Sequence, residues 1–327
     1  MILPRWDAGS MSIDFEIDRL RARCIGCGLC TKVCPSFKHG GLNPMEVMMG
    51  GEGDLNTCIG CGNCSSVCPR TNPAIVMKDL IARDGGIHVS KVFRETGYAM
   101  PAAEQTLEPA WSGDGIYVMP GCVVKAKVPH VLYAASVAFR AMGFGSRELP
   151  GNTCCMHPVQ FREMTEDERV HYKRVIGDSA GGDDIVTLCG GCSDELTDAD
   201  VPAMHIVQFL HDHMDRLPRF GRTIRVGLEP GCSVMRYADL MREVVEAMGC
   251  EVVNRTMGCC GKNTPVSGPL IAEREAECEG AEWIVVACPM CLVKFDSQPD
   301  GISTVHIAEL VAMASGDSSS LGQHRLL

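Results

Sequence analysis

Short apolar stretches alternate with amphipathic ones over the second two thirds of the chain. Gly115–Cys122 and Thr223–Cys232 are each predicted to form an apolar strand that ends in Pro-Gly-Cys. A helical pattern follows each strand, at Val131–Met142 and Ala238–Met248, and a glycine suited to a helix C-cap comes directly after it. This alternation predicts parallel α/β units.

The same order of elements occurs twice, which indicates an internal duplication. An adjacent cysteine pair follows the first helix of each half, and a second helix is predicted at Glu166–Ile176 and at Leu270–Glu279. Apolar strands then lead into CxxC motifs, at Asp184–Cys189 and Trp283–Cys288. Because α/β folds place their ligands at the ends of parallel strands, we expect the cysteines to gather at one sheet edge. Pseudo-symmetry would then bring the two halves' cysteines near one another.

The first hundred residues show a different pattern, with short helices and few β-branched runs. Helices are expected at Glu16–Arg23, Pro44–Met49 and Ala74–Arg83, and the last of these is amphipathic. Pro101–Gly115 has the Pro, Gly and polar content of a linker. We therefore expect an N-terminal domain at residues 1–100, a linker at 101–115, a first repeat at 116–220 and a second repeat at 221–327.

Composition narrows the classes of function. The net charge is −11 and no basic run is long enough to follow a phosphate backbone, so we expect no nucleic-acid partner. The N-terminus lacks the apolar run of a signal peptide, and no stretch reaches the length of a membrane span, which predicts a cytoplasmic protein that meets a membrane only through a partner. No Gly-rich dinucleotide fingerprint opens a βα unit, so we expect no flavin in this chain.

Eighteen of the twenty cysteines fall into four ordered groups. Two groups are CxxCxxCxxxCP runs, the pattern of two-cluster ferredoxins, in which the fourth cysteine of each run binds the other cluster. The ligands predicted for one 4Fe–4S cluster are Cys24, Cys27, Cys30 and Cys68. Those predicted for the other are Cys58, Cys61, Cys64 and Cys34. Thiolates would also suit zinc, but two complete runs favour iron–sulfur clusters.

The other two groups contain five cysteines each, in the order single, adjacent pair, CxxC. The first consists of Cys122, Cys154, Cys155, Cys189 and Cys192. The second consists of Cys232, Cys259, Cys260, Cys288 and Cys291. A cubane needs only four thiolates for its four irons, so five favour bridging sulfurs or an open, non-cubane cluster. The alternative is an ordinary cubane with one spare cysteine in each half.

The single–pair–CxxC pattern resembles the CCG domain, and its fusion to a double ferredoxin run resembles heterodisulfide reductase. The resemblance covers roughly residues 16–315. It implies an N-terminal α-helical two-cluster ferredoxin-like domain followed by an α/β part with two pseudo-symmetric CCG repeats. It also implies two non-cubane 4Fe–4S clusters on the ten cysteines, beside two cubane 4Fe–4S clusters. Met156 departs from the motif, whereas Gly261 keeps it.

This resemblance predicts an iron–sulfur oxidoreductase subunit of a larger complex. It would reduce a small disulfide, the heterodisulfide of coenzyme M and coenzyme B, with electrons from a flavoprotein or cytochrome subunit. A rival hypothesis is an electron-relay subunit of a flavin-dependent hydroxyacid or glycerol-3-phosphate dehydrogenase. Relatives of that kind often have incomplete cysteine sets in one or both halves. A third hypothesis is an assembly scaffold that binds clusters without turnover.

A few further side chains are candidates for substrate binding. His157 and Lys262 lie close to the two cysteine pairs, where they could bind an anionic coenzyme or supply a proton, or could instead be solvated or structural. His205 and His306 occupy matching positions just before predicted helices. We expect these two histidines to cap a helix or to lie in the core.

Overall fold

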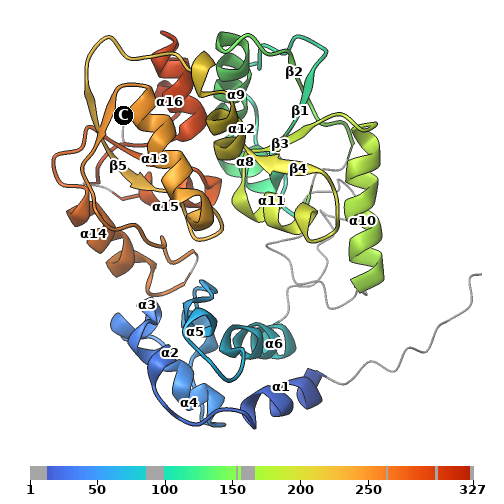
Figure 1. Cartoon of the computed structure of the whole chain (residues 1–327), viewed down its shortest axis with the longest axis vertical. Helices are drawn as coiled ribbons and strands as arrows, with labels where there is room; N and C mark the ends of the chain where they lie inside the picture. Colours follow the sequence, from blue (N-terminus) through green and yellow to red (C-terminus); the bar gives the residue numbers. More distant parts are fainter. Residues whose placement is uncertain are drawn as a thin grey trace, which may run out of the picture. The chain divides into compact units, whose positions relative to one another are not determined.

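The computed structural model describes residues 13–85, 99–151, 154–155, 166–262, 264–298 and 301–324 (Figure 1). These residues form two compact units, one containing residues 13–85 and 264–268 and the other containing residues 99–262 and 269–324. The finer boundaries expected at residues 100, 115 and 220 stay predictions.

The described residues of the first unit form short helices joined by loops. Its elements are α1 (Ile13–Arg21), α2 (Leu29–Lys32), α3 (Pro35–Lys38), α4 (Pro44–Met48), the 3-10 turn η1 (Leu55–Thr57), α5 (Asn63–Ser66) and α6 (Pro73–Gly85). The three helices expected in this region correspond to α1, α4 and α6, with small shifts at their ends. Their buried faces, with Ile17, Met48 and Val76 among them, form a small core of their own.

The second unit contains two four-stranded parallel sheets with the same strand order. The first sheet is β2-β1-β3-β4 and the second is β6-β5-β7-β8. The strands are β1 (Ile116–Met119), β2 (Ser146–Glu148), β3 (Ile185–Thr187), β4 (Ala203–His205), β5 (Ile224–Glu229), β6 (Cys250–Val252), β7 (Trp283–Val286) and β8 (Thr304–His306). The parallel α/β prediction is confirmed, whereas pseudo-symmetry between the halves stays an interpretation.

Strand register positions the cysteine motifs. In each sheet, the strand that leads to Pro-Gly-Cys is the direct neighbour of the strand that leads to CxxC. The register places Met119 opposite Thr187 in the first sheet and Glu229 opposite Val286 in the second. Because the paired strands run parallel, the two motifs of each repeat leave their sheet at the same edge.

Helices surround both sheets. They are α8 (Gly121–Lys127), α9 (His130–Ala141), α10 (Glu166–Ser179), α11 (Gly190–Thr197), α12 (Ile206–Asp212), α13 (Ala238–Ala247), α14 (Ser267–Glu277), α15 (Pro289–Phe295) and α16 (Ile307–Ala314), with 3-10 turns η2 (Met214–Arg216), η3 (Met235–Tyr237) and η4 (Ser319–Gln323). Helix α9 of the first repeat packs against α16 of the second, and α12 packs against α13 (Figure 1). One hydrophobic core therefore contains residues of both repeats, such as Leu132, Phe209, Val244 and Leu310.

Among the residues that the structure describes, no single helix is long and apolar enough to cross a membrane. The consecutive helices α8 and α9 meet the length and composition requirement only when they are taken together, and they are bent by 115° at the break between them. Both helices contribute buried side chains to the core, including Val124 and Leu132.

Candidate metal centres

The two cysteine runs of the first unit are interleaved. One pocket is lined by Cys24, Cys27, Cys30 and Cys68, together with apolar neighbours such as Met45 and Met48. Burial and the charges of Cys61, Cys58 and Cys34 together raise the pKa of Cys64 to about 12. The fourth cysteine of each run therefore lies with the first three of the other run.

Glycines shape the backbone around these cysteines. Gly26 and Gly28 in the first run, and Gly60 and Gly62 in the second, have φ between +64° and +79°. Side chains with a Cβ rarely adopt this left-handed conformation, which glycine adopts without strain. Such turns point successive backbone N–H groups into a concave site that attracts anionic groups, including iron–sulfur clusters. The local backbone thus fits the donor set that the cysteines provide.

In the second unit, hydrogen bonds between thiol groups connect the cysteines of the first repeat, apart from Cys154 and Cys155, which are neighbours in the chain. Cys122 is hydrogen-bonded to Cys154. Cys192 is hydrogen-bonded to both Cys155 and Cys189. All of them except Cys189 are buried. The structure thus brings together the single cysteine, the adjacent pair and the CxxC motif of this repeat.

The five cysteines of the second repeat are connected in the same way. Cys232 is hydrogen-bonded to Cys259, and Cys259 to its neighbour Cys260. The Sγ atoms of Cys260 and Cys291 lie 3.4 Å apart, and Cys291 is also hydrogen-bonded to Cys288. Each half of the second unit therefore assembles a five-sulfur donor set.

The two donor sets meet between the repeats. Cys189 of the first repeat is hydrogen-bonded to Cys288 of the second. Thiol contacts, together with the peptide link between the neighbours Cys154 and Cys155, therefore connect all ten cysteines, here called the ten-cysteine series. Cys250 and Cys278, which lie outside it, are buried in the core.

The glycine of each Pro-Gly-Cys motif allows its cysteine to lie close to the CxxC motif. Gly121 has φ +74°, and a Cβ at this position would lie 2.8 Å from Cys192 Sγ. Gly231 has φ +94°, and a Cβ there would lie 2.8 Å from Cys288 Cβ and 3.0 Å from Cys291 Sγ. Any larger residue would push the CxxC motif away from the adjacent strand.

The buried thiols of the ten-cysteine series strongly affect one another's ionisation. Hydrogen bonding to Cys154, burial and neighbouring thiolate charges together raise the pKa of Cys122, and the pKa of Cys232 is raised in the same way by Cys259. In contrast, hydrogen bonds from Cys259 and Cys291 lower the pKa of Cys260 to about 5. Buried thiolates so close together disfavour each other's ionisation. Bound iron would supply the positive charge that lets these soft thiolates ionise together, so the donor set of each repeat fits an iron–sulfur cluster.

The two candidate substrate residues differ in what the structure shows. Met156 and His157 lie outside the described residues. Lys262 is half-buried, directly after Gly261, with φ +51°. Burial lowers its pKa, but the charges of Cys232, Cys259, Cys288 and Cys260 outweigh burial and raise it above the ordinary value. The ammonium group is therefore held among the cysteines of the second repeat.

His205 and His306 are helix caps, as expected from the sequence. The Nδ1 atom of His205 accepts a hydrogen bond from the backbone N–H of Val207 at 3.2 Å, and His306 caps α16 in the same way. Both side chains are fully buried. His205 Nε2 also lies 3.1 Å from the carbonyl oxygen of Ala287, directly before Cys288. A helix cap of the first repeat thus supports the CxxC motif of the second.

Glu229 is a charged neighbour of the site that the sequence analysis did not single out. Its Oε2 accepts a hydrogen bond from the backbone N–H of Gly258 at 2.9 Å, and Arg274 Nε lies 3.7 Å from its Oε1. Burial raises the pKa of Glu229 to about 7. A glutamate at the end of an otherwise apolar strand, directly before Pro-Gly-Cys, is the signal that could have identified it.

Two family models match this chain. The 4Fe-4S dicluster domain matches residues 16–69, and the cysteine-rich CCG domain matches residues 116–197 and 227–296. The first match contains both ferredoxin runs. The second falls on both repeats of the second unit.

Several curated proteins are similar to the chain at low identity. One subunit of the ferredoxin/F420H2-dependent CoB–CoM heterodisulfide reductase of Methanosarcina acetivorans is 25% identical over 264 residues, which cover 61% of this chain and 88% of the relative. The corresponding subunit of the ferredoxin:CoB–CoM heterodisulfide reductase of Methanosarcina mazei is 23% identical with the same coverage. One subunit of the fumarate reductase (CoM/CoB) of Methanothermobacter marburgensis is 24% identical, and the match covers 90% of this chain and 61% of the relative.

These relatives are oxidoreductase subunits, and the matched domains are iron–sulfur domains. The chain is accordingly an iron–sulfur oxidoreductase. It contains a 4Fe-4S dicluster domain ahead of two matches to the cysteine-rich CCG domain, and it is similar to subunits of heterodisulfide reductases.

Proposed function

We propose that this chain is the disulfide-reducing subunit of a larger cytoplasmic redox complex, and that its substrate is the heterodisulfide of coenzyme M and coenzyme B. The observation that carries the proposal is the ten-cysteine series, which spans both repeats and joins them at Cys189 and Cys288. The names of the three relatives, all of which include CoM and CoB, support this choice of substrate.

Each group of cysteines has its own part in this proposal. One cubane 4Fe–4S cluster is held by Cys24, Cys27, Cys30 and Cys68, and a second by Cys58, Cys61, Cys64 and Cys34. Each five-cysteine set of the second unit holds a further, non-cubane 4Fe–4S cluster. When bound, the clusters supply electrons one at a time and soft iron sites that accept thiolates.

The cysteines themselves explain why two repeats are needed. Cleaving a disulfide requires two electrons and releases two thiolates. Because the two donor sets meet at Cys189 and Cys288, the two sulfur atoms of one substrate can lie against different repeats. The burial of seven of the ten cysteines keeps water away from the thiolates.

Lys262 has the charge that an anionic coenzyme needs. Its half-buried ammonium group lies among the cysteines of the second repeat. We assign it to the binding of a sulfonate or phosphate group, or to the delivery of a proton to a departing thiolate. His157 has the corresponding role in the first repeat.

The first unit is assigned to electron entry. Cys27 is exposed and six of the other seven cysteines in this unit are partly exposed, whereas most of the ten-cysteine series is buried. Exposed ligands bring the clusters close to the surface, where a flavoprotein or cytochrome subunit can dock. The chain itself needs no flavin in this arrangement.

The proposal is tested by assaying the anaerobically purified chain with reduced viologen and the heterodisulfide. We expect turnover, and about sixteen irons per chain for four 4Fe–4S clusters. The Cys259→Ala variant is expected to lose turnover and about four irons. Cys250→Ala, which changes a cysteine of the same repeat outside the series, is the matched control and should keep both.

Two results would contradict the proposal. Unchanged turnover in Cys259→Ala would remove the cysteine series from the reaction. A full iron content without any turnover would instead favour an electron-relay subunit of a flavin-dependent dehydrogenase.

A further inference from the structure

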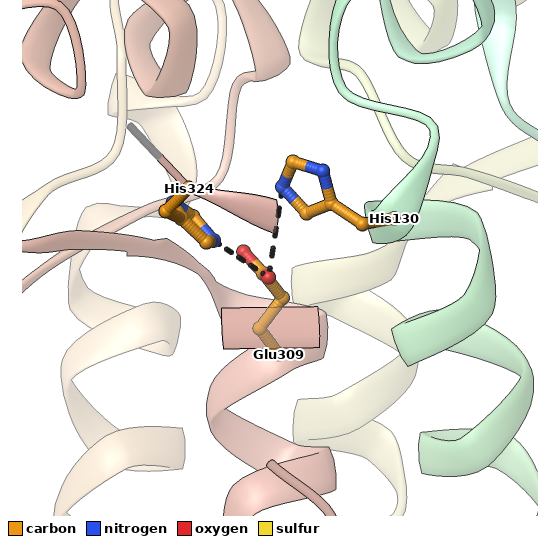
Figure 2. Close-up of side chains that lie close together, drawn as sticks. All are labelled: His130, Glu309 and His324. Carbon is orange, nitrogen blue, oxygen red and sulfur yellow. Dashed lines mark hydrogen bonds and ion pairs between the residues drawn. The ribbon is translucent and has the colours of Figure 1, made fainter. Parts of the chain in front are cut away.

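A compact group of two histidines and one glutamate lies outside the ten-cysteine series. His130 is the first residue of α9, Glu309 lies in the first turn of α16, and His324 follows η4. One ring nitrogen of each histidine and one carboxylate oxygen of Glu309 all lie within 4.8 Å of one another. Figure 2 shows the three side chains converging from separate elements. The group thus joins the first repeat to the second.

All three side chains are buried, and one ring nitrogen, His130 Nε2, has no hydrogen-bond partner among the described residues. His324 Nε2 lies 2.9 Å from Glu309 Oε1, a hydrogen bond. His130 Nε2 lies 3.8 Å from the same oxygen, which is too long for a hydrogen bond, and its side chain is only 6% exposed. A buried polar atom without a partner costs free energy, so this nitrogen needs a ligand that the described residues do not provide.

A second layer of contacts fixes the orientation of two of these side chains. His324 Nδ1 lies 3.3 Å from Asp296 Oδ1, so Nε2 is the atom directed at Glu309. Glu309 Oε2 accepts a hydrogen bond from the backbone N–H of His306 at 2.8 Å, which leaves Oε1 directed at the histidines. Histidines that bind metals commonly hold a carboxylate with their other ring nitrogen in this way.

A protonated His324 between two carboxylates would explain part of this arrangement. It would satisfy Asp296 and Glu309, but it would leave His130 Nε2 unpartnered. A divalent cation bound by both histidines and Glu309 satisfies all three donor atoms. The cation therefore accounts for the whole group, whereas the proton accounts for part of it.

The donor atoms also fit a metal in type and spacing. Two imidazole nitrogens and one carboxylate oxygen are a known ligand set of zinc, with bonds of about 2.0–2.2 Å. Around a tetrahedral ion with such bonds, donor atoms lie about 3.3 Å apart. The two distances to Glu309 Oε1, 2.9 Å and 3.8 Å, lie on either side of this value.

We propose that His130, Glu309 and His324 bind a divalent transition-metal ion of the zinc class, with Asp296 orienting His324. The ion ties the two CCG repeats together at the contact between α9 and α16. A hydrogen bond of 2.8 Å from the Tyr133 hydroxyl to Asp317 Oδ2 joins the same region. The metal site is independent of the proposed disulfide reduction.

The test uses the protein with its iron–sulfur clusters intact, because free cysteines would also bind zinc. The anaerobic protein is incubated with zinc, washed, and examined by elemental analysis and zinc K-edge X-ray absorption. We expect one tightly bound zinc per chain, with nitrogen or oxygen ligands at about 2.0–2.1 Å and no sulfur at about 2.3 Å. Zinc should also raise the unfolding temperature.

Variants of two ligands, of the orienting Asp296 and of a surface histidine complete the test. His130→Ala and Glu309→Gln should lose the zinc and the zinc-dependent rise in unfolding temperature. Asp296→Asn should weaken zinc binding by about 10- to 100-fold. The matched control is His211→Ala, because His211 Nε2 also lies 3.1 Å from a carboxylate, that of Glu243, but near the surface. Iron content shows whether each variant has folded.

Several outcomes would overturn the proposal. They are the absence of zinc from the wild-type protein after incubation, zinc coordinated by sulfur, and an unchanged nitrogen or oxygen site in His130→Ala. If His130→Ala fails to fold, Glu309→Gln and Asp296→Asn decide the question, because each keeps the volume of the original side chain. Full zinc affinity in both would refute the site.

Discussion

The two CCG repeats share a backbone framework but differ in the charges near their cysteines. Both have the same strand order, a Pro-Gly-Cys motif after the strand, and a histidine cap. Met119 precedes this motif in the first repeat, whereas the buried carboxylate of Glu229 precedes it in the second. The comparison shows that backbone geometry positions the sulfurs, while single side chains set the electrostatics around each donor set.

The largest effect is expected when the shared geometry is disturbed. Gly231→Ala should lower the free energy of unfolding by about 3 kcal/mol, because its φ of +94° disfavours a Cβ that would also press on Cys288 and Cys291. Gly121→Ala should cost less, about 2 kcal/mol, because its Cβ meets only the end of the Cys192 side chain. Thermal unfolding and iron content measure both.

Gly221→Ala is the control for these two variants, since a Cβ at this position meets nothing within 4 Å. It should unfold like the wild type. Equal stability of all three variants would show that close packing at Pro-Gly-Cys does not hold the donor sets in place.

A smaller effect on stability is expected from Glu229, the buried carboxyl group that distinguishes the second repeat. Because the pKa of Glu229 is raised from 4.5 to about 7, the folded state binds this proton more tightly than the unfolded state. Stability should therefore fall as the pH rises from about 4.5 through about 7. Glu229→Gln should remove this loss and be more stable by about 2 kcal/mol above pH 7. Unfolding temperatures between pH 5 and 8 measure the difference.

Met119→Leu is the matched change in the first repeat. It alters no charge, so the difference in unfolding temperature between this variant and the wild type should stay constant with pH. A pH-independent difference for Glu229→Gln as well would show that the buried carboxylate does not titrate in this range.

The smallest of these effects concerns Lys262. If its charge attracts an anionic coenzyme, Lys262→Gln should raise KM by about tenfold, equivalent to about 1.4 kcal/mol of binding, while Lys262→Arg should restore most of the affinity. Lys125→Gln is the control in the first repeat, because its ammonium group is already paired with Glu148 at 2.5 Å. An unchanged KM in Lys262→Gln would exclude this role.

Sequence patterns predicted the strands that have a run of hydrophobic residues. They did not predict the short strands whose residues show no such pattern. The apolar strands that became β1 and β7 were expected because their hydrophobic residues are consecutive. Strands β2 and β6 were not, since three residues such as Ser-Arg-Glu have no strand pattern and become extended by pairing with β1 and β5. The short helices α8 and α15 were missed because the cysteine motifs interrupt their periodicity.

The sequence likewise predicted some parts of the candidate sites and not others. Cysteine spacing indicated each donor set, because metal ligands on one loop or strand end lie at short sequence intervals. The duplication led us to expect the two cysteine sets near one another, but the spacing did not identify the individual side chains that meet between the repeats. The burial of Glu229 depends on α14, and His130 meets Glu309 only because α9 packs against α16. Such contacts arise from tertiary packing and leave no local pattern.

The contact between Cys189 and Cys288 has a consequence for how the protein must be assembled. Two neighbouring thiols can lose two electrons and two protons to oxygen and form a disulfide between the repeats. Once formed, that bond removes a donor from each five-sulfur set and covalently joins the two halves. Iron and sulfide must therefore reach the reduced chain before oxygen does, and reconstitution should begin from fully reduced thiols under anaerobic conditions.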